Sequence, residues 1–151
     1  MYKKIVVALD ESDGSVAALP HAVSLAQRDG ATLVIAHART GALRADPDAM
    51  LERTVEGLRS GGIDARLEIR ATAQEEVATF LAEVAAELGA DLIVIAGRGR
   101  SSLSGALLGS VTQGLLHVAP CPVLVVPMDT DADERRLPTA SSIRIRKVDA
   151  S

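Results

Sequence analysis

The chain has 151 residues, nearly half of them apolar, and a formal net charge of −4. A chain of this length forms one domain around one core, which has to be aliphatic because Tyr2 and Phe80 are the only aromatic residues. The acidic balance argues against a nucleic-acid partner, and no apolar run is long enough for a membrane span or a secretory signal. Cys121 is the sole cysteine, which excludes an internal disulfide, so we expect a cytoplasmic protein with no membrane partner.

The chain opens with a short strand followed by a helix. Residues 5–9 form an apolar, β-branched run that predicts a buried strand. Residues 10–13 supply N-cap side chains for a helix that continues to about Arg28, and Gly30 stands where a C-terminal cap belongs. Pro20 lies inside this predicted helix, where it either kinks the helix or occupies a position that tolerates a missing N–H.

Two more strands are expected in the next stretch, over residues 31–38 and 65–69. Between them, Asp46 and Pro47 have the form of an N-cap followed by proline in the first helical turn. The glycines at 61–62 end that helix. The first half of the chain therefore alternates strand and helix.

The same alternation continues in the second half. Thr72 and Glu75 have the spacing of a capping box, and apolar residues follow at helical spacing until Gly89. The later predicted elements are a strand over 91–96, a helix over 110–117 and a strand over 121–126. Continuous apolar strands that alternate with helices are typical of a parallel sheet covered on both faces. In such sheets ligands bind at the carboxyl ends of strands where the strand order reverses, here after the first and fourth strands.

The segment from Ala96 to Thr112 is the strongest functional signal. It is rich in glycine and serine and stands between an apolar strand and a helix. Free backbone N–H groups and the helix dipole make such a helix start suitable for phosphate. Arg98 and Arg100 would add positive charge, although solvated loop arginines are the alternative. The loop lacks the Gly-Lys-Ser/Thr of a Walker A sequence, and Ser102 replaces the third glycine of a dinucleotide fingerprint.

A longer pattern resembles the universal stress protein family. It consists of Gly99, nine intervening residues, the triplet Gly109, Ser110 and Val111, and the final strand with its flanking residues, 119–126. The resemblance covers about residues 3–127 and includes the opening run 4–10, His37 and residues 90–94.

The resemblance implies a fold and an assembly. The implied fold is α/β, a single-domain three-layer αβα structure with a five-stranded parallel sheet in the order 3-2-1-4-5, of the adenine nucleotide alpha hydrolase-like class. The family is usually dimeric through the last strand, here residues 122–126.

The resemblance also implies a nucleotide site. The nucleotide-binding branch holds ATP with Gly-x-x-Gly-x9-Gly-Ser/Thr, and this chain has Ala96 at the first glycine. Asp10 would face the ribose or a Mg²⁺ ion, and the alternative is that Asp10 only caps the first helix. The other nucleotide-binding residues carried over are Ala8 beside the base, Ala38 and Ile95 around adenine, Gly99 in the loop, and Gly109, Ser110 and Val111 at the helix start. Arg98, which stands where that branch often has histidine, and Arg100 are added to the predicted site for their positive charge.

Three functions remain open from the sequence. The first is an ATP-binding stress-response module whose nucleotide changes its contact with an unidentified protein partner. The second is a nucleotide-free dimeric interaction domain, and the third is a weak ATPase or autophosphorylating protein. No catalytic residue is assigned: His37 and His117 have no nucleophile or acid partner in the sequence, and Cys121 is interpreted as a packed thiol.

Residues 129–151 differ from the rest of the chain. They are polar and carry five acidic and five basic residues, so the predicted organisation is a domain over 1–128 and a tail over 129–151. Residues 142–148 alternate like an edge strand. The tail is either solvated or contains a strand that docks on a partner or on its own sheet.

Overall fold

A computed structural model describes residues 1–9, 17–41, 47–97 and 108–127, so the predicted boundary at 128 and the tail lie outside the described residues. The elements follow the predicted alternation. In chain order they are β1 (Lys4–Ala8), α1 (Ala18–Asp29), β2 (Thr32–Arg39), α2 (Pro47–Ser60), β3 (Ala65–Ala71), the 3₁₀ turn η2 (Gln74–Glu76), α3 (Val77–Leu88), β4 (Leu92–Ala96), α4 (Ser110–Val118) and β5 (Val123–Val126). None of these helices is long and apolar enough to cross a membrane.

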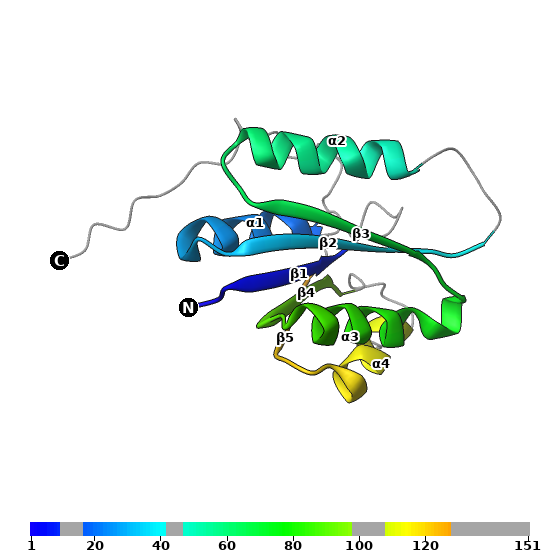
Figure 1. The fold of residues 1–151 in the computed structure, drawn as a ribbon. Coiled ribbons are helices and arrows are strands. Elements are labelled where there is room, and N and C mark those ends of the chain that lie inside the picture. Colours follow the sequence, from blue (N-terminus) through cyan, green and yellow to red (C-terminus); the bar gives the residue numbers. More distant parts are fainter. Residues whose placement is uncertain (10–16, 42–46, 98–107, 128–151) are drawn as a thin grey trace.

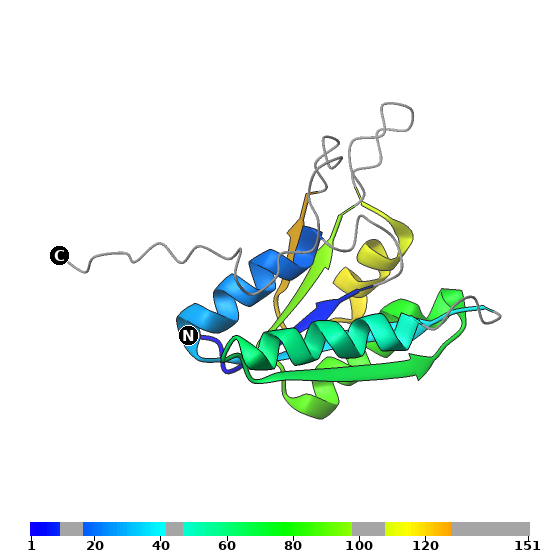
Figure 2. The same ribbon diagram turned by 90° about the horizontal axis from the view of Figure 1, so that it is seen from above.

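The strands form one parallel sheet in the order β3-β2-β1-β4-β5, which confirms the predicted fold class. Helices α1 and α2 cover one face of the sheet, and α3 and α4 cover the other (Figures 1 and 2). Each face has its own aliphatic cluster, one around Ile5, Val7 and Leu33, the other around Val6, Val34 and Ile93. Strand β1 lies at the centre, and Ile5, Val6 and Val7 are fully buried because side chains on both faces are covered.

Helix α1 begins at Ala18, and its N-cap residue Ala17 makes no side-chain hydrogen bond. Residues 10–13, which the sequence predicts as N-cap residues, lie outside the described part. Pro20 is the third helical residue, where an N–H would have no acceptor within the helix, so proline is tolerated without a kink. Gly30 adopts φ 66° and caps the C-terminus as expected.

The predicted capping box of Thr72 and Glu75 before α3 is wrong. The Thr72 hydroxyl donates to the carbonyl of Arg70 at 3.3 Å, and Glu75 lies in the 3₁₀ turn η2. Helix α3 therefore begins at Val77, without a side-chain cap. A threonine hydroxyl can bond nearby backbone groups in several geometries, and Thr72 bonds the preceding Arg70 carbonyl instead of a helix N–H.

The amino end of β1 is attached to its neighbours by two carboxylates. The Tyr2 N–H donates to Asp29 at 2.8 Å, and the N–H groups of Lys3 and Lys4 donate to Asp91 at 2.7 and 2.9 Å. The hydrogen bond from Arg28, together with that from the Tyr2 N–H, lowers the pKa of Asp29 to about 2. The bonds from the Lys3 and Lys4 N–H groups lower the pKa of Asp91. Both carboxylates are therefore held in their ionised form.

Candidate functional site

The carboxyl ends of β1, β2 and β4 lie next to one another because β1 pairs with both of the other strands. From β1 the chain continues outward to β2 and β3 on one side, and β4 and β5 lie on the other side. The strand order therefore reverses at β1 and β4, the place where open α/β sheets bind ligands.

Small side chains occupy this edge of the sheet. Ala8 is the register partner of Ala36, Ala38 follows two residues later on β2, and Ala96 and Gly97 end the β4 region. The middle of each of these strands carries Val, Ile or Leu instead. The aliphatic filling of the core thus decreases toward the strand ends, where a ligand would need space.

The structure places most of the predicted adenine-lining residues on one face of the sheet. Ala8, Ala38, Ile95 and Val111 all contribute to the aliphatic cluster beneath α3 and α4. Ala96 instead packs on the opposite face, with the cluster beneath α1 and α2. Alternation of side chains along β4 separates Ile95 from Ala96 in this way.

Alanine at the first glycine position introduces no backbone strain. Ala96 lies within β4 opposite Val126, and no described residue other than glycine has a positive φ. The Gly97 N–H continues the ladder by donating to the Val126 carbonyl at 2.7 Å. The substitution therefore adds only a methyl group, and that methyl group points to the face away from Ala8 and Ile95.

The start of α4 presents backbone N–H groups. Gly109 is the N-cap residue, with extended backbone at φ −71° and ψ 165°, and it offers no side chain to satisfy them. Ser110 follows it as the first helical residue. The Gln113 N–H makes the first bond of the helix, to the Gly109 carbonyl at 3.0 Å, so the amides of Ser110 and Val111 precede the bonded part. No acidic residue lies in this first turn.

His37 links two of the strand ends. Its ring is 2% exposed, and Nδ1 lies 2.9 Å from the carbonyl oxygen of Leu9, the last described residue before Asp10. Nδ1 must carry a proton to donate to that carbonyl. Nε2 is buried and has no hydrogen-bond partner among the described residues. The sequence gave no sign of the Leu9 contact, because the two residues are 28 positions apart.

Four predicted site residues lie outside the described part of the chain: Asp10, Arg98, Gly99 and Arg100. The predicted part of Asp10 in a Mg²⁺ site is therefore not described either. Among the described residues, no three His, Cys, Asp or Glu side chains gather as a metal site would require. Burial raises the pKa of the Cys121 thiol, which favours the unreactive protonated form. A hollow of about 750 Å³ lies elsewhere, between α2 and β3, and none of the predicted site residues lines it.

The fold and the strand order define an open parallel α/β protein with helices on both faces of its sheet, and comparison with known proteins gives the family. The model of the universal stress protein family matches residues 1–127, and the chain belongs to this family. It is 32% identical over 140 residues to universal stress protein MJ0531 of Methanocaldococcus jannaschii, covering 83% of this chain and 82% of that protein. It is 30% identical to universal stress protein YxiE of Bacillus subtilis, covering 83% and 99%.

Two solved structures of relatives contain adenine nucleotides. One is a universal stress protein in complex with cAMP, 31% identical, with a TM-score of 0.64 over 85% of this chain and 98% of the other. The second is the universal stress protein from Archaeoglobus fulgidus in complex with dAMP, 25% identical, with a TM-score of 0.60 over 83% and 98%.

Proposed function

We propose that this chain binds an adenine nucleotide at the carboxyl ends of β1, β2 and β4. The observation that carries the proposal is the start of α4, where Gly109 leaves the amides of Ser110 and Val111 ahead of the first helical hydrogen bond. These amides and the helix dipole suit a phosphate group. The cAMP and dAMP complexes of relatives support an adenine base as the other part of the ligand.

The nucleotide we propose is ATP, with Mg²⁺. Its base would lie against Ala8, Ala38 and Ile95, and its phosphates would lie at the α4 start within reach of Arg98 and Arg100. Well-placed charged contacts to phosphate contribute about 1.5–3 kcal/mol each, and a helix start adds about 0.3–2 kcal/mol. Ala96 introduces no backbone strain, so it does not reduce the binding free energy that these phosphate contacts contribute.

We further propose that nucleotide occupancy regulates contact with a protein partner in a stress response, and that the protein is a homodimer through β5. Leu116 and Val118 of α4 and Leu124 of β5 are large apolar residues with exposed side chains. Strand β5 is an edge of the sheet, and an apolar edge strand is a site for pairing with another chain.

Equilibrium dialysis with ATP and Mg²⁺ tests the nucleotide proposal. We expect saturable binding by the wild type and a loss of at least about tenfold in affinity for Gly109→Asp, because a carboxylate at the helix start repels phosphate. The matched control is Gly57→Asp, the same exchange at an exposed position of α2 with open space around it. Equal binding by the wild type and Gly109→Asp, or no binding at millimolar ATP, would contradict the proposal.

The absorbance spectrum of the purified protein provides a second test. The chain has one tyrosine and no tryptophan, so copurified adenine would dominate its near-ultraviolet absorbance. If the wild type released phosphate from ATP faster than the Gly109→Asp variant, that result would favour the alternative function of a weak ATPase.

A further inference from the structure

Strand β3 forms an edge of the sheet, and no strand of the described residues pairs with its outer side; we call this the free edge of β3. The Leu33 N–H donates to the Asp64 carbonyl at 2.8 Å, and the Thr72 N–H donates to the Arg39 carbonyl at 3.1 Å. The alternation of a parallel ladder therefore directs the main-chain groups of even-numbered β3 residues toward β2 and those of Leu67 and Ile69 away from it. The Arg59 side chain covers only the amino end of this edge, where its Nε donates to the Ala65 carbonyl at 2.7 Å.

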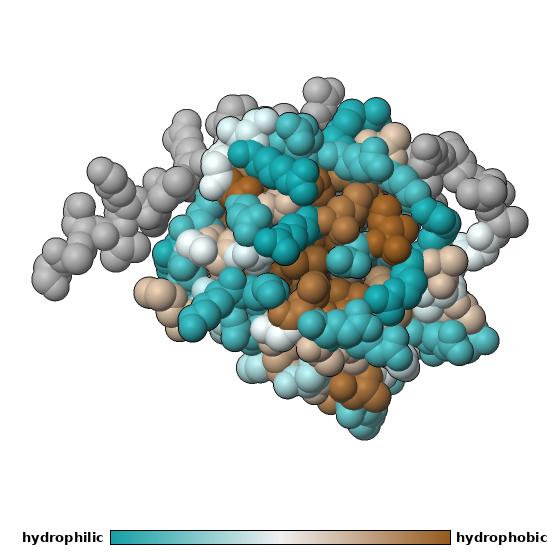
Figure 3. Space-filling view, in the orientation of Figure 1, coloured by the Kyte–Doolittle hydropathy of each residue, from teal (hydrophilic) through white to brown (hydrophobic). Residues whose placement is uncertain are grey.

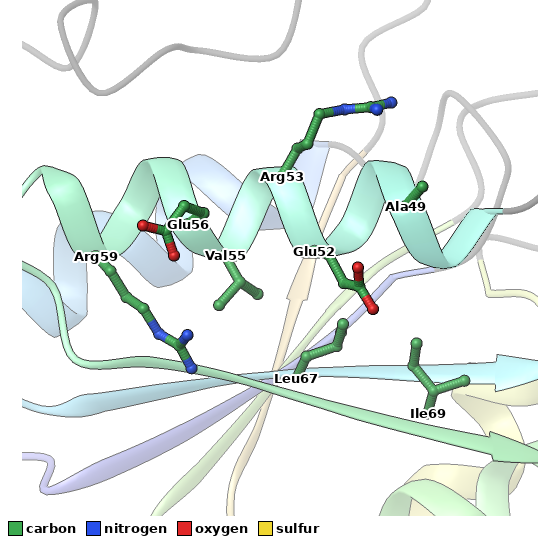
Figure 4. A pocket seen from close by; sticks show the side chains of 8 residues that line it. All are labelled: Ala49, Glu52, Arg53, Val55, Glu56, Arg59, Leu67 and Ile69. Carbon is green, nitrogen blue, oxygen red and sulfur yellow. The ribbon is translucent and has the colours of Figure 1, made fainter.

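A hollow of about 750 Å³ lies on the α2 side of this edge, and its lining combines apolar side chains with those of Glu52, Arg53, Glu56 and Arg59. Figure 4 shows Leu67 and Ile69 of β3 and Val55 of α2 directed into it, with Glu52 at its border. Figure 3, which looks onto this edge, shows a brown apolar patch between α2 and α3 within a mostly teal rim. The helix thus covers β3 incompletely and leaves apolar surface beside unpaired main chain.

The α3 side of the same edge is acidic. Arg70 lies 3.5 Å from Glu83 and 3.2 Å from Glu87, so a single guanidinium serves two carboxylates. Glu68 lies on the same face of β3 as Arg70 because side chains alternate along a strand. Helix α3 contains no lysine or arginine. A basic group on this side would meet an excess of negative charge.

We propose that residues 142–148 of this chain add as a sixth strand to the free edge of β3. In an extended conformation Ile143 and Ile145 share one face, and Arg144 and Arg146 share the other. This two-sided pattern matches the edge, since the isoleucines would pack on Val55, Leu67 and Ile69 in the hollow. The arginines would face Glu68, Glu83 and Glu87. The main chain of the added strand would satisfy the N–H and C=O groups of Leu67 and Ile69.

The connecting segment is long enough. β5 and β3 are four strand spacings apart, which is about 19 Å at about 4.8 Å per strand. Fourteen residues lie between Pro127 and Ser142, and the extended chain from one to the other spans up to about 50 Å. The segment can therefore reach either end of the seven-residue strand β3.

Amide hydrogen exchange in the full chain tests the proposal. We expect the Leu67 and Ile69 amides to exchange about tenfold or more slowly in the wild type than in an Ile143→Asp/Ile145→Asp variant, because the aspartates cannot enter the hollow. The matched control is Ile143→Val/Ile145→Val, which keeps apolar, β-branched side chains and should retain the protection. Equal exchange of these amides in the wild type and the aspartate variant would overturn the proposal.

A spin label identifies the occupant of the edge. In a Cys121→Ala background, a nitroxide on Ser141→Cys should broaden the amide resonances of β3 while leaving those of β5 sharp. Mixing nitroxide-labelled chain at natural isotope abundance with ¹⁵N-enriched chain that carries no nitroxide distinguishes the chain's own segment from the segment of a second copy. Absence of broadening in the mixture is expected for the chain's own segment, whereas broadening there would assign the edge to a second copy and overturn the proposal.

Discussion

Single side chains hold the main chain at both ends of the central strand β1. At the carboxyl end, His37 binds the Leu9 carbonyl, and at the amino end Asp91 accepts the N–H groups of Lys3 and Lys4. Each contact joins residues far apart in the sequence, by 28 positions for His37 and by 88 for Lys3 and Asp91. These residues therefore fix how β1 meets its neighbours.

His37→Leu should lower the free energy of unfolding by about 1–3 kcal/mol, because it leaves the carbonyl of Leu9 without its donor in a buried place. Urea unfolding at neutral pH, followed by circular dichroism, measures the change. His37→Asn is the control, since a side-chain amide nitrogen can take the place of Nδ1 and should restore part of the loss. A leucine variant as stable as the wild type would show that this hydrogen bond is dispensable.

Acid should destabilise the protein through Asp29 and Asp91. Both have a pKa lowered in the folded state, so their contribution is complete above the unfolded value of about 3.9 and is lost as the pH falls from about 4 toward 2. In Asp29→Asn the urea midpoint should therefore fall less between about pH 5 and about pH 2.5 than in the wild type. Glu56→Gln, on the exposed surface of α2, should retain the wild-type slope. An unchanged slope in Asp29→Asn would contradict the assignment.

At the scale of elements, two helical glycines differ in what surrounds them. Gly114 of α4 faces α3, where an added Cβ would lie 3.1 Å from the Cβ of Ala78. Gly57 of α2 has nothing within 4 Å of the same position. The close approach of α3 and α4 thus depends on a missing side chain, whereas the glycine in α2 has no such function.

Gly57→Ala should raise the free energy of unfolding by about 0.5–1 kcal/mol, because alanine loses less backbone entropy in a helix. Gly114→Ala should gain less than this or lose stability, since α3 and α4 must separate slightly to accept the methyl group. Thermal unfolding of the two variants beside the wild type provides the comparison. Equal stabilisation by both would mean that the α3–α4 contact is loose.

At the scale of the whole molecule, the two sheet edges differ. Strand β3 is bordered by the hollow beneath α2 and by acidic α3. Strand β5 is short and carries exposed Leu124, with Leu116 and Val118 exposed on α4. We assign β5 to the proposed homodimer and β3 to the chain's own residues 142–148. Each edge would then be covered by a different segment.

Leu124→Lys should convert the proposed dimer to a monomer in analytical ultracentrifugation, because a charge on the edge opposes pairing with a second apolar strand. Met50→Lys, a similar exchange at an exposed position of α2, should leave the mass unchanged. The circular dichroism spectrum verifies that the fold survives. A dimeric Leu124→Lys variant would place the interface elsewhere.

Residue patterns alone predicted the alternation of strands and helices and the glycine caps after α1 and α3. These signals are local, since burial on both faces requires a continuous apolar strand and a left-handed cap favours glycine. The N-caps were less predictable: the pair Thr72 and Glu75 does not cap α3, which begins without a side-chain cap. Hydroxyl and carboxylate side chains have several local partners, and sequence spacing does not choose among them.

The sequence by itself therefore determined the fold class, the family and the position of the α4 start, because these depend on periodicity and on one long motif. The tertiary structure alone decided which side chains share a face, and it separated Ala96 from Ala8, Ala38 and Ile95. It also paired His37 with Leu9 and placed a hollow containing Val55, Leu67 and Ile69 beside the free edge of β3. These relations join positions distant in the chain, and they arise only when the sheet and its helices pack together.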